Sequence, residues 1–267
     1  YIYSMPVERI IKLFAEHGFE MNKATAHGLI KKAAGLFDLV EDVLKETVLS
    51  DNYLSMDESY YTVLTSDTNN SSGKSTAKGY IWAALANHLK LVHFFYENGS
   101  RSRKVLTGYL REDYRGAIQS DGLGNYKIIE KEAYPDAIRL SCFQHCKRKF
   151  LNITGNKDAE KIVRIINRLY QNEHRIPPDW TASQILDYRN KYAPPILKEL
   201  KKELINIKNK KSTLPKSELS KAINYTLNEY DALCNYIRCA DYAPDNNAIE
   251  RLMRYISLSR RNSLFCG

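Results

Sequence analysis

The sequence changes character near Cys142, and this change constrains the fold more than any other feature. Between Asp51 and Cys142, short runs rich in tyrosine, valine and other β-forming residues alternate with glycine-, asparagine- and serine-rich stretches. After Cys142, apolar residues recur at helical spacing almost to the end of the chain. A strand-rich segment followed by a helix-rich one predicts an α/β chain whose strands come first.

The strand-rich segment predicts a short order of elements. The expected strands are 53–57 continuing in 60–64, then 79–86, 91–96, 116–121 and 138–142, with a helix at 104–111. The polar stretch from Asp67 to Lys78 predicts a flexible hairpin-type loop. Two of the predicted strands end at an acid, Asp57 and Asp121, and the second acid is followed by Gly122.

The first 50 residues predict two helices. Pro6 is placed to open the first helix, Gly18 to end it, and Thr25 to cap the second. In the second helix, Leu29, Leu36, Val40, Val43 and Leu44 recur at helical spacing. The pair is compatible with a packing hairpin or with a DNA-reading helix-turn-helix.

Prolines divide the helical part of the chain. Pro177-Pro178 is expected to break it, and Pro194-Pro195 to open a long basic amphipathic helix. Residues 198–211 hold six lysines and two glutamates, so this face is either solvated or directed at DNA. A further helix is expected from Ser217 to Tyr236.

Charge and cysteine content narrow the class of protein. The 267 residues carry a net charge of +9 and are 43% hydrophobic, which suits a globular protein with an anionic partner. We find no membrane-spanning run and no signal-peptide pattern, so we expect a cytoplasmic protein. Five scattered cysteines predict a reduced compartment, and Cys142-x-x-His145 lacks the second ligand pair of a structural zinc site.

Three acids stand out by position, namely Asp57, Asp121 and Glu250. Glu250 is set among arginines on a predicted helix, and one reading is an ion pair with Arg254 four residues later. The other reading is a metal ligand, because cutting or joining phosphodiesters commonly uses two divalent cations held by a few carboxylates. Composition and spacing alone do not distinguish these acids from the other 28.

Several motifs in order resemble the DDE transposases of the insertion-sequence-66 type. The motifs are Asp57-Glu58, Lys78 to Trp82, Tyr96 to Arg103 with its Arg101-Ser102 step, Gln119 to Gly122 with Tyr126, Cys142 to Phe150, Leu214 to Ser217, Asp245 to Arg251, and Arg260 to Phe265. Each alone is weak, but the ordered set covers nearly the whole chain.

The resemblance implies a fold and a domain order. It implies an α/β, ribonuclease-H-like mixed sheet, similar to a retroviral integrase core, interrupted by a large all-helical insertion. The expected segments are 1–50, an N-terminal helical segment; 51–142, the strands of the core; 143–240, the helical insertion; and 241–267, the final core helix with the catalytic glutamate.

The resemblance also implies an activity. It implies a DNA transposase that cleaves transposon ends and joins the freed 3′-hydroxyl to target DNA, using two Mg²⁺ or Mn²⁺ ions. The family's catalytic and metal-binding acids correspond to Asp57, Asp121 and Glu250. Cys142, His145, Asn246 and Asn247 are expected to support the active site.

Partners follow from the same comparison and from the basic residues. We expect DNA as the partner, with the protein a homo-oligomer on DNA, possible accessory proteins of the same element, and a place at the bacterial nucleoid. The residues expected to contact DNA are Lys147, Arg148, Lys149, Arg251, Arg254, Arg260 and Arg261. The family's N-terminal DNA-binding and coiled-coil region has no counterpart here, so recognition of transposon ends is expected to lie largely outside this chain.

The sequence departs from the family at two places. Ser59 stands where the family usually has threonine, and Cys146-Lys147 replaces an alanine-arginine pair. Neither change touches the three acids. Two alternatives remain open: an inactive DNA-binding or assembly remnant of a transposase, and a ribonuclease-H-like nuclease.

Overall fold

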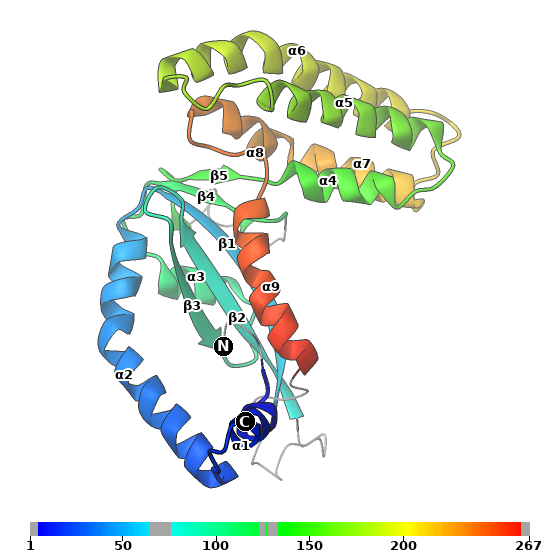
Figure 1. The fold of residues 1–267 in the computed structure, drawn as a ribbon. Coiled ribbons are helices and arrows are strands. Elements are labelled where there is room, and N and C mark those ends of the chain that lie inside the picture. The colour runs from blue at the N-terminus through cyan, green and yellow to red at the C-terminus, as the bar shows by residue number, and fades with distance from the viewer. Residues whose placement is uncertain (1–4, 65–75, 123–125, 128–132, 263–267) are drawn as a thin grey trace. The chain divides into compact units, whose positions relative to one another are not determined.

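The chain forms two compact units. A computed structural model describes residues 5–64, 76–122, 126–127 and 133–262 (Figure 1). One unit, here called the sheet unit, comprises residues 1–112 and 247–267; the other, the helix-rich unit, comprises residues 113–246. Most of the predicted loop 67–78, the end of the last motif at 263–265 and Cys266 lie outside the described residues.

Three antiparallel strands form the centre of the sheet unit. β1 (Tyr53–Leu64) pairs with β2 (Thr76–Ala86), which pairs with β3 (Leu91–Glu97). The positions of these three strands agree with the sequence prediction. The register places Asp57 opposite Ala83 and Tyr60 opposite Tyr80. Because side chains alternate along a strand, these two pairs lie on opposite faces of the sheet.

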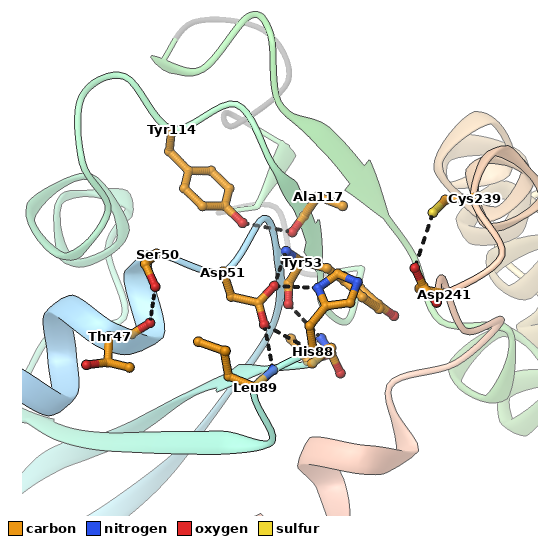
Figure 2. A network of polar contacts seen from close by, with 12 residues as sticks. Thr47, Ser50, Asp51, Tyr53, His88, Leu89, Tyr114, Ala117, Cys239 and Asp241 are labelled. Atoms are coloured by element: carbon orange, nitrogen blue, oxygen red, sulfur yellow. Dashed lines mark hydrogen bonds and ion pairs between the residues drawn. The ribbon is translucent and has the colours of Figure 1, made fainter. Parts of the chain in front are cut away.

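A single carboxylate fixes the turn between β2 and β3. Asp51 accepts hydrogen bonds from the backbone N–H groups of Tyr53, His88 and Leu89 and from the His88 ring (Figure 2). Burial by itself would raise the pKa of Asp51, but these hydrogen bonds outweigh it and hold the pKa below its usual value. The turn residue Lys90 has a φ of 57°.

Helices cover both faces of this sheet. On one face, Ile249 and Met253 of α9 (Asn247–Asn262) form a buried apolar cluster with Ala83 and Leu85. On the other face, Tyr109 of α3 (Arg103–Tyr109) stacks on Phe95, with ring centroids 4.2 Å apart. The sheet is therefore the middle layer of this unit.

Two N-terminal helices complete the sheet unit, with one correction to the prediction. α1 (Val7–Glu16) and α2 (Lys23–Leu49) are both present, but Asn22 caps α2 by accepting from Thr25 N–H. The predicted cap Thr25 lies inside the helix, because Asn22 offers its side-chain oxygen to the same turn three residues earlier. The apolar positions Leu29, Leu36, Val40 and Val43 are exposed.

The helix-rich unit starts with two short parallel strands. β4 (Ala117–Gln119) pairs with β5 (Ile138–Leu140). One apolar core then joins α4 (Phe143–Leu151), α5 (Lys157–Glu173), α6 (Ala182–Lys208) and α7 (Glu218–Asn228). Arg189 of α6 forms an ion pair with Glu173 of α5. Its guanidinium also donates to three backbone carbonyls after α8, those of Tyr236, Cys239 and Ala240.

Two predictions about these helices were wrong. Pro194-Pro195 does not open a helix but lies inside α6. The carbonyls that lose their donors belong to Asn190 and Lys191, which are exposed to water, while buried Ala193 and Ile196 keep the helix packed.

The helix expected from Ser217 to Tyr236 is also interrupted. Ser217 caps α7 as its type suggests, but α7 ends at Asn228 and is followed by α8 (Tyr230–Cys234) and the 3₁₀ turn Asn235–Arg238. Glu229 stands at the break, and its buried carboxylate pairs with Arg139 and Lys127. No helix in the described part of the chain is long and apolar enough to cross a membrane.

Candidate active site

Asp57 was predicted to end a strand but lies inside β1, on the face of the sheet that α9 covers. Its carboxylate is half-buried and accepts the backbone N–H of Glu58 at 2.9 Å. Ser59 and Tyr61, two and four residues later, share this face and contact the end of α9. Arg260 donates to the Ser59 hydroxyl at 3.1 Å, and the Tyr61 hydroxyl lies 3.3 Å from Ser259 Oγ.

Glu250 lies on α9, the helix that covers this face. It lies in the first turn of this helix and is half-buried beside Ile249, which is fully buried. Ile249 packs in the cluster that contains Ala83, and Ala83 is the register partner of Asp57. The fold therefore packs the helix that carries Glu250 on the face of the sheet that holds Asp57, although the two acids are 193 positions apart in the sequence.

Asp121 belongs to the helix-rich unit; it was predicted to end a strand but lies two residues after the end of β4. It is half-buried, and the backbone before it is held by the hydrogen bond from Ser120 N–H to the Leu140 carbonyl. Gly122 N–H donates to the Tyr225 hydroxyl at 3.1 Å. A Cβ atom at position 122 would clash with the Tyr225 ring, so this contact requires glycine.

Tyr225 is a residue that the sequence reasoning missed. It lies on α7, and Lys149 places its ammonium 4.3 Å from the ring centroid. Burial, followed by nearby negative groups, raises the pKa of Tyr225 well above its usual value, so its hydroxyl keeps its proton. The one signal in the sequence was the glycine directly after Asp121, since a glycine allows a large side chain to pack closely against the backbone.

Cys142 and Asn246 meet within the helix-rich unit. Asn246 donates its backbone N–H to Cys142 Sγ at 3.3 Å, and Phe143 N–H donates to the Pro244 carbonyl at 3.0 Å. Gln119 adds a third bond, from its side-chain amide to the Ala243 carbonyl at 2.9 Å. Cys142 thus holds the segment that leads to α9.

The other two residues that were expected to support the active site, His145 and Asn247, lie on helices. His145 is half-buried on α4, and Asn247 is the first residue of α9. Cys146, beside His145, is buried, and burial raises the pKa of its thiol far above the usual value. Such a thiol is a packing group and not a nucleophile.

The residues predicted to contact DNA divide between the two units. Lys147, Arg148 and Lys149 lie on α4, with Arg148 and Lys149 exposed. On α9, Arg251, Arg254 and Arg261 are exposed, whereas Arg260 is half-buried against β1. Arg254 therefore remains accessible on the side of α9 that faces water.

The sequence matches the family described as "Transposase IS66 family" over residues 1–267. The chain belongs to this family. The motif order that suggested the resemblance is thus confirmed at the level of the family. The family places the chain among transposases.

Curated relatives carry no activity in their names. The chain is 33% identical over 161 residues to the uncharacterized protein y4jD of Sinorhizobium fredii (strain NBRC 101917 / NGR234), covering 58% of the chain and 31% of y4jD. It is 24% identical to y4qI of the same strain over 286 aligned residues, covering 100% of the chain and 50% of y4qI. The chain thus spans half or less of these relatives.

A solved structure gives a weak likeness. The Drosophila P element transposase strand transfer complex aligns with 96% of this chain and 80% of its own, at 11% identity and a TM-score of 0.36. A score of this size does not establish a shared fold. The ribonuclease-H-like assignment therefore stays a prediction, and the fold itself is mixed α/β.

Proposed function

We propose that this chain carries the catalytic carboxylates of a DDE-type DNA transposase. In this proposal Asp57, Asp121 and Glu250 act together to cleave transposon ends and to join the freed 3′-hydroxyl to target DNA. Each joining step forms one bond from the 3′-oxygen to a target phosphorus and breaks the phosphorus–oxygen bond to the leaving 3′-oxygen, which takes up a proton. The observation that supports the proposal is that α9, which carries Glu250 in its first turn, packs on the face of the sheet that holds Asp57.

The donor chemistry of these residues fits Mg²⁺ or Mn²⁺. The three candidate side chains are carboxylates, and each of the three residues is half-buried. Hard divalent cations prefer oxygen ligands and take one or two protein carboxylates each, with phosphate and water completing the shell. Two bound ions would polarise the scissile phosphate and stabilise the attacking and leaving oxygens.

Cations around Glu250 support a DNA substrate. Arg251, Arg254 and Arg261 are exposed on the same helix, and the chain carries a net charge of +9. Guanidinium groups contact phosphates through paired donors, and such contacts weaken steeply with salt. A ribonuclease-H-like core, a helical insertion, a homo-oligomer on DNA, accessory proteins and location at the nucleoid belong to the same proposal.

The deciding experiment is Asp121→Asn in the complete protein. The change removes a charge and a strong metal ligand with little change of shape, so the protein should fold and bind transposon-end DNA in EDTA as well as before or slightly better. Cleavage and strand joining should both fall by orders of magnitude, because the same ions serve both displacements.

A matched control is Asp179→Asn, which alters an exposed acid of the same unit. It should leave cleavage and joining unchanged. If the Asp121→Asn protein cuts and joins at the wild-type rate, the proposal is wrong. If the wild-type protein binds DNA but never cuts it with either metal, the chain is a binding remnant.

A further inference from the structure

A polar pocket opens in the sheet unit, next to Asp57 in sequence but built largely on the other face of the sheet. Its volume is about 310 Å³. The lining residues are Glu58, Ser59, Tyr60, Lys78, Tyr80, Arg101 and Arg260. Pockets of about 300 Å³ are at the lower end of those that hold small ligands, so this one suits a group of about nucleotide size.

Strand alternation builds the pocket. Side chains two residues apart on a strand point to the same face, and so do those of paired residues on neighbouring strands. The pairing of β1 with β2 therefore places four side chains on one face, namely those of Glu58, Tyr60, Lys78 and Tyr80. Gly79 lies between the last two, and a Cβ atom there would clash with the Tyr96 ring. The glycine therefore lets a large ring close the opposite face while its neighbours project into the pocket.

One cation of the pocket is held by a carboxylate. Arg101 forms an ion pair with Glu58, whose side chain is only 2% exposed, and its Nε donates to Glu58 Oε1 at 3.0 Å. The same guanidinium lies 5.5 Å from the centroid of the Tyr80 ring. Arg101 and Glu58 thus form a fixed wall in which the charges balance.

Two further cations converge on the Tyr60 ring. The Arg260 guanidinium lies 4.2 Å from its centroid and the Lys78 ammonium 5.6 Å from it. Arg260 also donates to the Tyr60 carbonyl at 3.0 Å, which fixes it at the edge of β1. Among the described residues that line the pocket, Glu58 is the sole carboxylate against three cations, so the lining carries a net charge of +2.

Like charges held around one ring repel each other, and an anion between them removes the repulsion. The Tyr60 ring lowers the cost of placing each cation there but does not neutralise either one. The arrangement is therefore poised for an anion that accepts from an ammonium and a guanidinium together. A phosphate oxygen pair has this chemistry.

We propose that Lys78 and Arg260 bind one backbone phosphate of a DNA strand in this pocket, with Tyr60 as the platform that holds both cations. The identity of the ligand as DNA rests on the proposed function, whereas the anion site rests on the pocket alone. The phosphate would then anchor DNA on the sheet unit at a point separate from the candidate catalytic face. The motif residues Lys78 and Arg260 thereby gain a shared role.

The test is a double-mutant cycle on DNA binding by the complete protein in EDTA, read by fluorescence anisotropy. Lys78→Gln and Arg260→Gln should each raise the dissociation constant about tenfold, the loss expected for one charge-assisted hydrogen bond. Each should also lower the salt slope by about one unit. The double variant should raise the dissociation constant by clearly less than the product of the two single increases, because both side chains hold one phosphate.

Controls separate this site from general charge. Lys32→Gln removes the same charge from an exposed position on α2. The fold-increase in the dissociation constant that it causes should multiply with the increase caused by Lys78→Gln. Lys78→Arg keeps the charge and should restore most of the binding. If Lys78→Gln changes affinity no more than Lys32→Gln does, or if its effect multiplies fully with that of Arg260→Gln, the phosphate site is disproved.

Three probes identify the source of the phosphate, namely a duplex oligonucleotide, a single-stranded one and inorganic phosphate. Coupling with either oligonucleotide supports the site and identifies the strand form it takes. Effects on inorganic phosphate binding alone would overturn the DNA assignment. The binding assay contains EDTA and is therefore independent of the metal-dependent cleavage assay. Coupling between Lys78 and Arg260, together with wild-type rates of cleavage and joining by the Asp121→Asn protein, would overturn only the catalytic proposal. Absence of coupling, together with loss of cleavage by that variant, would overturn only the phosphate site.

Discussion

In the helix-rich unit, Glu229 is fully buried between Arg139 and Lys127, whereas in the sheet unit Asp57 and Glu250 remain half-buried. Arg139 donates to Glu229 at 2.6 Å, and its side chain is only 3% exposed. Burial alone would raise the pKa of Glu229, but Arg139 and then Lys127 outweigh it and hold the pKa below its usual value.

The difference concerns what a carboxylate is free to do. A buried acid between two cations has its oxygens committed, so it fixes the packing of β5 against the break between α7 and α8. The half-buried acids of the sheet unit are less enclosed than Glu229, and our proposal gives them a catalytic role. In this proposal, a carboxylate stabilises one unit and takes part in the reaction in the other.

The largest effect should come from Glu250→Gln in the sheet unit. The change keeps the shape of the side chain but removes a charge, so cleavage and joining should fall about a thousandfold or more while the free energy of unfolding stays nearly unchanged. Strand-transfer assays and urea unfolding on the same preparation measure both. An active Glu250→Gln protein would remove Glu250 from the proposed site.

The same substitution in the helix-rich unit should have the opposite result. Glu229→Gln leaves Arg139 buried without its counter-charge, which should cost about 3–5 kcal/mol of stability. Activity per folded molecule should persist at temperatures where the variant remains folded. Calorimetry and urea titration give the stability, and Glu203→Gln serves as a more exposed control. A stable Glu229→Gln protein would contradict the contrast between the units.

A smaller effect is expected from Asp51→Asn at the turn of the sheet unit. The variant should lose about 1–3 kcal/mol at neutral pH, because its backbone donors lose a charged acceptor. The folded pKa of Asp51 lies below the reference value of 3.8, so its contribution is present above that pH and disappears as pH falls below it. Unfolding curves from pH 7 to about pH 2 should therefore show a constant gap above pH 3.8 and convergence of wild type and variant below it. A gap that stays constant with pH would mean that the charge of Asp51 does not stabilise the turn.

Local pattern was sufficient to predict the strands. β1, β2 and β3 lie where tyrosine- and valine-rich runs placed them, but β4 ends at Gln119, two residues before Asp121. The same local reasoning failed at Pro194-Pro195, since it assumed that proline must begin a helix. Whether a proline can lie inside a helix depends on whether the carbonyls four residues before it, which lose their hydrogen-bond donors, face water. The sequence does not contain that information.

The sequence by itself determined which side chains of β1 share a face, because the alternation of side chains along a strand is a local property. Because β1 runs unbroken from Tyr53 to Leu64, this alternation separates Asp57, Ser59 and Tyr61 from Glu58 and Tyr60. Only the tertiary structure decided what each face meets. Register and helix packing depend on burying apolar surface between distant segments, and this placed Ala83 opposite Asp57, Ile249 against Ala83, and the Arg260 guanidinium on Tyr60.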